Sequence, residues 1–126
     1  MEVLPYLSYA YRYMQKIRGP TMQPINRETL EKMNEAKKED FVLINVLPRE
    51  AFREAHIRTS VNIPHEEDDF EATVEKVAGG KDRKIVVYCA SKECDASPKA
   101  ARKLDQAGFE RVYDYEGGTR DWLQNH

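Results

Sequence analysis

The fold of this chain is decided by the stretch Lys84-Ile-Val-Val-Tyr-Cys-Ala-Ser-Lys-Glu-Cys-Asp-Ala-Ser97. An apolar, β-branched run ends at Cys89, a short polar loop follows, and Ser97-Pro98 indicates the start of a helix. In such an arrangement the loop N–H groups and the positive end of the helix face the sulfur and favour its thiolate form. We therefore predict that Cys89 is a nucleophile with a pKa below its ordinary value.

The segments around this stretch predict an α/β fold. Buried strands are indicated at residues 41–46 and 85–88, with shorter strands at 61–63 and 112–115. Helices are expected at residues 26–37, 48–55, 69–78 and 97–107, and a last short one around Trp122. Alternating strands and helices imply a parallel sheet with helices on both faces, whose functional loops lie beyond the carboxyl ends of the strands. Cys89 stands at one of those ends.

The chain divides into two parts, an N-terminal helical extension with its linker at residues 1–24 and a domain at residues 25–126. Residues 4–18 have the apolar spacing of an amphipathic helix, and Gly19-Pro20 ends it. This helix also carries Tyr6, Tyr9, Tyr11 and Tyr13. It either packs its apolar stripe on the domain or forms a docking face, which would make a homodimer through this helix.

Composition excludes several classes of protein. The chain has 126 residues and a net charge of −2, and the absence of a long basic run argues against nucleic acid. No apolar stretch approaches the roughly 20 residues needed to span a bilayer, so we expect no membrane association. Two cysteines do not make a disulfide scaffold, and the N-terminus lacks a signal-peptide pattern. We therefore expect a cytoplasmic protein.

From about residue 41 to the end, the chain resembles the rhodanese-like domain. The family's Leu-Ile-Asp-Val-Arg strand corresponds to residues 43–47, and its Gly-His-Ile-Pro-Gly-Ala-x-Asn-Ile-Pro segment to residues 55–64. Three further pieces match, namely Val87-Tyr88-Cys89, the helix residues Ser97, Ala100, Ala101, Leu104 and Gly108, and the tail with Val112, Gly117-Gly118 and Trp122. Their order and spacing over roughly two-thirds of the chain carry the resemblance.

This resemblance implies a rhodanese-like fold and a sulfurtransferase that holds sulfane sulfur as a persulfide on Cys89. It implies a small sulfur donor and a thiol or protein acceptor as partners, with neither a cofactor nor a metal. The substrate-binding loop would comprise Ala90, Ser91, Lys92, Glu93, Cys94, Asp95 and Ala96. In the family this loop commonly carries a Gly and an anion-binding Arg, where this chain has Lys92 and Cys94. The backbone N–H groups of the loop must therefore carry most of the anion binding.

Other departures and alternatives stay open. Asn45 replaces the family's Asp, Leu47 its Arg, and Ala55 and Thr59 its glycines. Cys94 could act as a resolving thiol that attacks the persulfide, or it is an ordinary loop side chain. The alternative function is a non-catalytic or redox-sensing binding module.

Three other assignments are disfavoured. A cysteine phosphatase or arsenate reductase would need an Arg where Asp95 stands. A zinc site at Cys89 and Cys94 lacks further ligands at suitable spacing. His56 is expected to hold neighbouring backbone rather than act as a base.

Overall fold

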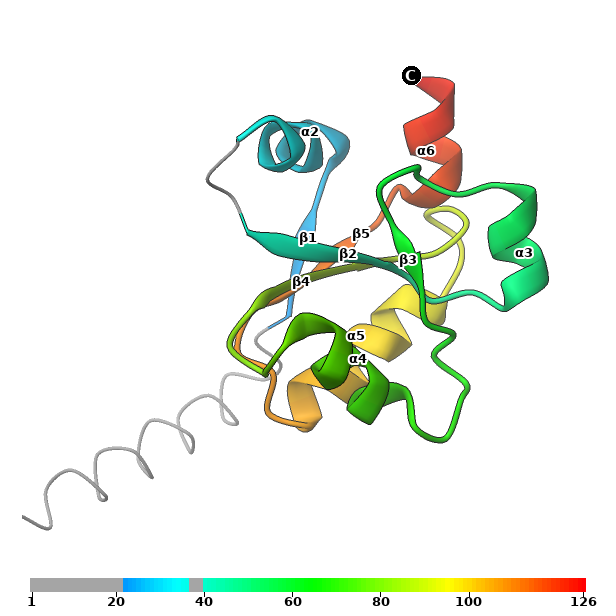
Figure 1. The fold of residues 1–126 in the computed structure, drawn as a ribbon. Coiled ribbons are helices and arrows are strands. Elements are labelled where there is room, and N and C mark those ends of the chain that lie inside the picture. Colours follow the sequence, from blue (N-terminus) through cyan, green and yellow to red (C-terminus); the bar gives the residue numbers. More distant parts are fainter. Residues whose placement is uncertain (1–21, 37–39) are drawn as a thin grey trace, which may run out of the picture.

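The central feature is a parallel five-stranded sheet with the strand order β1-β5-β4-β2-β3 (Figure 1). The computed structural model describes residues 22–36 and 40–126, and every strand pairing in this range is parallel. The strands are β1 Gln23–Ile25, β2 Phe41–Asn45, β3 Val61–Asn62, β4 Lys84–Tyr88 and β5 Val112–Tyr115. This architecture confirms the α/β class and the parallel sheet expected from the sequence.

Helices cover both faces of the sheet (Figure 1). They are α2 Arg27–Glu35, α3 Arg49–Glu54, α4 Phe70–Ala78, α5 Ala96–Gln106 and α6 Gly118–Gln124. Helices α4 and α5 lie on one face and α2 and α6 on the other, while α3 stands beside β3 at the sheet edge. Asn26 caps α2 through a 2.9 Å bond from the Thr29 N–H to its side-chain oxygen, as predicted.

Strand periodicity divides the core into two layers. Ile85 and Val87 of β4 point towards α4 and α5, whereas Val86 and Tyr88 pack with Leu30 of α2 on the other face. All five side chains are fully buried. Each such buried side chain contributes about 1.5–3 kcal/mol to the hydrophobic stabilisation of the fold.

The edge strand β1 was not predicted. Gln23 and Pro24 were expected to lie in a linker, but they pair with Tyr113 and Asp114 of β5. A proline lacks the N–H that a central strand needs, yet at the edge of a sheet that N–H can be missing without an orphaned partner. Because proline is a strand breaker in local sequence patterns, Pro24 led to the prediction of a linker where the structure has the edge strand β1.

The predicted helix at residues 4–18 and its homodimer face lie outside the described residues. Among the described residues, none of the helices has the length and apolar character required to cross a membrane.

Candidate active site

The candidate site lies where β4 ends and α5 begins. Side chains of β4 alternate between the two faces, so Cys89, which directly follows the strand, points to the same side as Ile85 and Val87. This places the sulfur under the first turn of α5, which starts at Ala96, one residue earlier than predicted. Only 1% of Cys89 is exposed. The sulfur is thus enclosed between the sheet and the helix.

Ser97 is the main polar partner of the Cys89 sulfur. Its backbone N–H donates to the sulfur at 3.4 Å, and its hydroxyl oxygen accepts from the Cys89 thiol at 3.4 Å. The Ser97 hydroxyl in turn donates to Oδ1 of Asp114 at 2.6 Å. Ser97 and Asp114 are each only 2% exposed. Thiol, hydroxyl and carboxylate therefore form a continuous buried chain.

The start of α6 holds the backbone of the loop after Cys89 through two hydrogen bonds. The Thr119 N–H donates to the Cys89 carbonyl and the Arg120 N–H to the Ala90 carbonyl, both at 2.9 Å. Gly118, at φ +68°, makes this approach possible, because a Cβ there would lie 2.5 Å from the Cys89 carbonyl oxygen. The loop backbone is consequently fixed at its first two residues.

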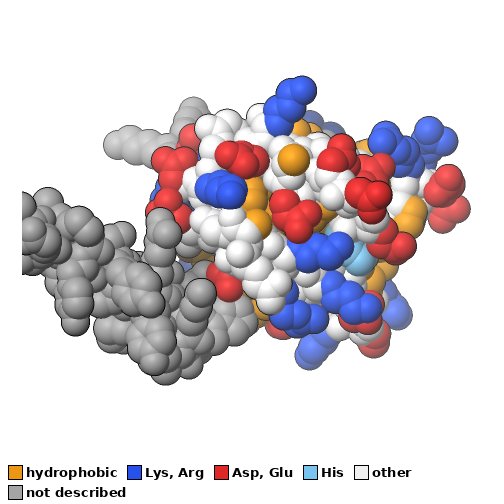
Figure 2. Space-filling model, turned by 90° about the horizontal axis from the view of Figure 1, so that it is seen from below, with side chains coloured by type: hydrophobic (Ala, Val, Ile, Leu, Met, Phe, Trp, Pro, Cys, Tyr) orange, Lys and Arg blue, Asp and Glu red, His pale blue; other side chains and the backbone are white. Residues whose placement is uncertain are grey.

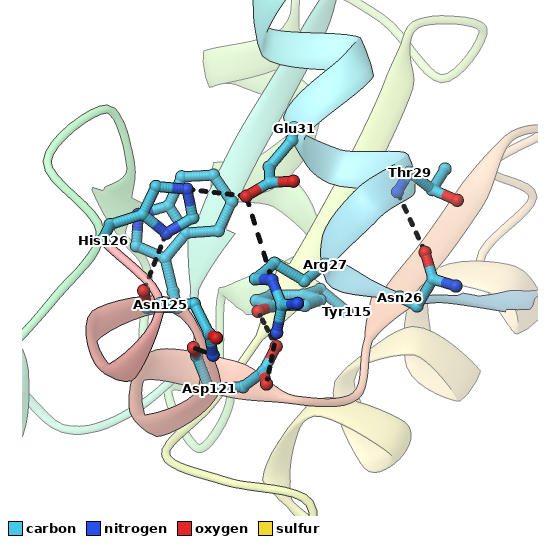
Figure 3. Close-up of polar contacts among 9 residues, drawn as sticks. Asn26, Arg27, Thr29, Glu31, Tyr115, Asp121, Asn125 and His126 are labelled. Carbon is cyan, nitrogen blue, oxygen red and sulfur yellow. Dashed lines mark hydrogen bonds and ion pairs between the residues drawn. The ribbon is translucent and has the colours of Figure 1, made fainter.

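Helix α6 is itself tied to α2 by a polar network (Figure 3). Asp121 accepts from the Tyr115 hydroxyl at 2.6 Å and from Arg27 at 3.2 Å. Glu31 lies 3.8 Å from Arg27 and 2.8 Å from Nε2 of His126. The element that holds the cysteine loop is therefore anchored to the opposite face of the sheet.

The predicted binding loop, residues 90–96, presents most of its side chains to solvent. Ala90, Lys92, Glu93 and Asp95 are exposed, Ser91 and Cys94 are half-buried, and Ala96 is buried. The Cys94 N–H donates to the Ser91 carbonyl at 3.1 Å, closing a turn. The Cys94 carbonyl then lies 3.7 Å from the Cys89 sulfur. Both cysteines are free thiols.

The predicted lowering of the Cys89 pKa is wrong. Burial and the side-chain hydrogen bond with the Cys94 thiol raise the pKa of the Cys89 thiol, and the two hydrogen bonds with Ser97 only partly oppose this. The main physical reason is burial, because the sulfur is enclosed between the sheet and α5, and the Cys94 thiol beside it adds to the effect. Within the described residues the backbone donor to the sulfur is the N–H of Ser97.

Charged side chains of both signs are interspersed over the surface that carries α4 and α5 (Figure 2). At the entrance of α5, Lys99 pairs with Asp95 at 3.1 Å. This lysine is therefore engaged with a carboxylate. No cluster of three or more His, Cys, Asp or Glu side chains in the described parts of the chain could hold a metal ion.

Two residues of the family pattern, the departure Asn45 and the retained His56, have structural contacts. The Asn45 side-chain oxygen accepts from the Leu47 N–H at 2.9 Å, a bond that an Asp could also accept. Nδ1 of His56 lies 2.7 Å from the Phe52 carbonyl oxygen, and its ring stacks on Phe52. His56 thus contacts backbone at the end of α3, as predicted.

A family model, the rhodanese-like domain, matches residues 26–125. The chain belongs to this family. A rhodanese-like domain is also found among its structural neighbours, since a solution structure of the rhodanese-like domain from the Anabaena Alr3790 protein has 26% identity and a TM-score of 0.68 over 81% of this chain and 74% of that one. The BH2092 protein of Bacillus halodurans reaches a TM-score of 0.72 at 29% identity, over 94% of this chain and 81% of that chain.

Two curated relatives carry functional names. The thiosulfate sulfurtransferase GlpE of Coxiella burnetii is 28% identical over 77% of this chain and 85% of its own length. The HTH-type transcriptional regulator Rv0324 of Mycobacterium tuberculosis is 32% identical over 82% of this chain. The alignment covers only 43% of the regulator, so this chain spans less than half its length.

Sequence reasoning missed the role of two residues in this rhodanese-like site. Ser97 was used as a helix start and as part of the family pattern, without a contact to the sulfur, and Asp114 was not singled out. The signal for Asp114 was present, because period two along β5 places it on the same face as the buried Val112. In register, Asp114 pairs with Val87, two residues before Cys89. A carboxylate on the core face of β5 could therefore have been predicted, whereas its place beside the cysteine strand follows only from this register.

Proposed function

We propose that this rhodanese-like domain is a sulfurtransferase that carries sulfane sulfur as a persulfide on Cys89. The observation that carries the proposal is the position of Cys89 at the carboxyl end of β4, with its sulfur bonded to the first turn of α5. Family membership and the name of the GlpE relative support the same activity. Sheet ends of this kind are where open α/β folds place their chemistry.

The proposed step is a displacement at sulfur. The Cys89 thiolate attacks the outer sulfur of a donor persulfide, a new S–S bond forms on Cys89, and the donor leaves as its thiolate. The persulfide is then attacked at its outer sulfur by an acceptor thiol, which restores the Cys89 thiolate. Sulfur oxidation states and charge balance in both halves without another reagent.

We favour a persulfide donor and a thiol or protein acceptor over thiosulfate and cyanide. Thiosulfate is a dianion, and the loop offers Lys92 but also Glu93 and Asp95. A neutral or singly charged persulfide makes a smaller electrostatic demand on such a loop. Thiol acceptors are abundant in the reducing cytoplasm, where we place the protein.

Access to the sulfur is part of this proposal. Cys89 is 1% exposed and the Cys94 carbonyl lies 3.7 Å from its sulfur, so the turn at residues 91–94 has to move aside for a donor to reach it. The same movement would let the Cys94 thiol approach the sulfur of Cys89. Cys94 can then attack the Cys89 sulfur of the persulfide, which releases hydrosulfide and leaves a Cys89–Cys94 disulfide that an external thiol reduces.

The test is to load the protein with a small-molecule persulfide, and separately with thiosulfate, and to weigh it intact by mass spectrometry. Wild type should gain one sulfur atom with the persulfide, Cys89→Ser none, and Cys94→Ser should hold the added sulfur longer. Release of hydrosulfide with formation of the disulfide in wild type alone supports the resolving role. Stable persulfide with no disulfide in wild type contradicts that role but leaves the carrier function standing.

A redox-sensing binding module is the second candidate. The raised pKa and near-complete burial of Cys89 favour the non-catalytic form of this module, because they suit a thiol that reacts rarely, and the presence of Cys94 beside it favours the redox-sensing form. Similarity to part of a transcriptional regulator is compatible with a sensing role. Failure of every sulfur donor to load wild type, together with formation of a Cys89–Cys94 disulfide under a mild oxidant, would favour this module over the transferase.

A further inference from the structure

The cysteine loop does not explain how the Cys89 thiol loses its proton. A sulfur-carrying cysteine must lose its proton, but this sulfur is enclosed, faces the Cys94 carbonyl and receives one backbone N–H from Ser97. Release of the proton to bulk water would add a second buried negative charge beside the carboxylate of Asp114, which is bonded to the same Ser97 hydroxyl. The proton therefore needs a nearby acceptor that is itself out of contact with water.

The geometry points to Asp114 as that acceptor, with the Ser97 hydroxyl as the bridge between carboxylate and thiol. The inference rests on the proposed role of Cys89 as a sulfur carrier. The two hydrogen bonds that link these side chains measure 3.4 Å from the Cys89 thiol to the Ser97 hydroxyl and 2.6 Å from that hydroxyl to the Asp114 carboxylate. Since Asp114 acts through Ser97 and does not touch the sulfur, it is a positioning residue for the thiolate.

The step balances within three side chains. The S–H bond of Cys89 breaks and its proton passes to Oγ of Ser97, while the proton already on Oγ passes to Oδ1 of Asp114. The thiolate then accepts from both the hydroxyl and the N–H of Ser97, and the neutral carboxyl donates to the hydroxyl. The site holds one negative charge before and after the transfer, and no proton reaches solvent.

Burial explains why one proton would be shared. Asp114 is 2% exposed, and a carboxylate and a thiolate in adjacent buried positions would repel each other in a medium that screens poorly. Burial also raises the pKa of Asp114, so its carboxylate is a stronger proton acceptor than an exposed one. A pair coupled in this way loses its two protons in two macroscopic steps.

Among residues 22–36 and 40–126, few other titratable groups face this pair. On the loop it is the Cys94 thiol, and at the end of β5 it is Glu116, whose charge adds to the raised pKa of Asp114. At the start of α5, Asp95 and Lys99 pair with each other at the surface. From the segment after β3, His65 faces Asp95, Lys99 and Lys103, and burial together with the two lysines lowers its pKa.

The test measures how the reactivity of Cys89 depends on pH. All proteins carry Cys94→Ser so that a single thiol reacts, and the rate of alkylation by iodoacetamide is recorded from about pH 5 to about pH 9. With a shared proton, the parent protein should show a plateau between the two macroscopic pKa values, where the rate changes less than about twofold per pH unit. Without one, the rate of a lone thiol falls about tenfold per pH unit below its pKa.

Three variants and a control decide the matter. Asp114→Asn and Ser97→Ala should lose the plateau and follow the tenfold slope, and Ser97→Thr, which keeps a hydroxyl, should retain it. Glu110→Gln removes an exposed carboxylate just before β5 and should behave as the parent does. A plateau that survives in Asp114→Asn or Ser97→Ala, or is absent from the parent protein, overturns the inference. Should Asp114→Asn not fold by circular dichroism, the two Ser97 variants still give the answer.

Sulfur loading, measured in parallel, separates this inference from the proposed function. A plateau without persulfide formation from any donor contradicts the transferase and leaves the shared proton standing. Persulfide formation without a plateau contradicts the shared proton and leaves the transferase standing.

Discussion

Two neighbouring residues of β5 belong to polar networks of opposite character. Asp114 points towards α5 and joins Ser97 and Cys89, whereas Tyr115 points towards α2 and α6 and joins Asp121 and Arg27 (Figure 3). Both residues of β5 are nearly or fully buried, at 2% and 0% exposure. A single strand therefore supplies both the site and the network that anchors α6.

The difference lies in how charge is compensated. On the α2–α6 side, the Asp121 carboxylate has the Arg27 guanidinium at 3.2 Å, and both side chains are about one-third exposed. On the α5 side, the partner of Asp114 is the neutral hydroxyl of Ser97 in a buried setting. The first arrangement favours stability, and the second keeps a proton close to a thiol at the expense of stability.

The largest effect should come from Gly118, the first residue of α6, which lies against the cysteine loop. Gly118→Ala places a Cβ 2.5 Å from the Cys89 carbonyl oxygen and 2.8 Å from Ser91 N, in addition to the strain of φ +68°. We expect a loss of roughly 3 kcal/mol in the free energy of unfolding by urea titration, with slower sulfur loading.

Gly79→Ala is the matched control for this substitution. Gly79 has a similar φ of +81°, but its Cβ would meet nothing within 4 Å. It should cost only about 1 kcal/mol, the strain alone. Equal losses for the two variants would mean that the contact between α6 and the cysteine loop does not constrain the fold.

The next effect concerns the pH dependence of stability. The folded pKa of Asp114 is raised, so the unfolded chain gives up this proton first and stability falls as pH rises from the ordinary value of 3.8 to the folded value. Asp114→Asn removes this loss. Relative to wild type, its free energy of unfolding should rise by up to about 1.4 kcal/mol per pH unit across that window and stay constant above it.

Urea titrations at a series of pH values check this expectation. Glu110→Gln, at an exposed position, should give a difference from wild type that is nearly independent of pH. A free-energy difference between Asp114→Asn and wild type that does not grow with pH would show that the carboxylate is compensated by a group other than Ser97.

The sheet and helices could be predicted because their signals are local. Continuous apolar runs mark β2 and β4, and Gly79 and Gly108, both at positive φ, follow the ends of α4 and α5. β1 could not be predicted in this way, because its three residues gain their strand conformation from pairing with β5, far along the chain. Edge pairing is a tertiary effect that local propensity does not report.

The site divides in the same way. The position of Cys89 followed from the strand and the helix start, both of which are local. The direction of its pKa shift did not, because it depends on the burial of the sulfur between the sheet and α5 and on the Cys94 thiol beside it. Prediction of the hydrogen-bond link from Cys89 to Asp114 would have required the register of β4 against β5, in which Val87 pairs with Asp114. Such long-range facts decide the chemistry of a site whose location sequence reveals.

A smaller effect is expected from Tyr115 on the anchoring side. Tyr115→Phe removes the 2.6 Å bond from the hydroxyl to Asp121 but keeps the buried ring, which lies edge-on to Trp122. Because Asp121 is partly exposed and water can replace the lost donor, we expect a cost of about 1–1.5 kcal/mol by urea titration. A cost well above this range would mean that the anchoring network is as dependent on burial as the site is.

The smallest effect should come from Arg27, whose bond to Asp121 is partly exposed on both sides. Arg27→Gln should lower the free energy of unfolding by about 0.5 kcal/mol at low salt and by less at 1 M salt, since screening weakens exposed ion pairs. Arg49→Gln is the control, because its pair with Glu67 is longer, at 3.4 Å, and more exposed, so its loss should be close to zero. A double-mutant cycle of Arg27→Gln with Asp121→Asn should give a coupling near the same 0.5 kcal/mol. A coupling of several kcal/mol would contradict the contrast between the networks, because it would show that a charge pair on the α2–α6 side is as strongly desolvated as the Asp114 carboxylate.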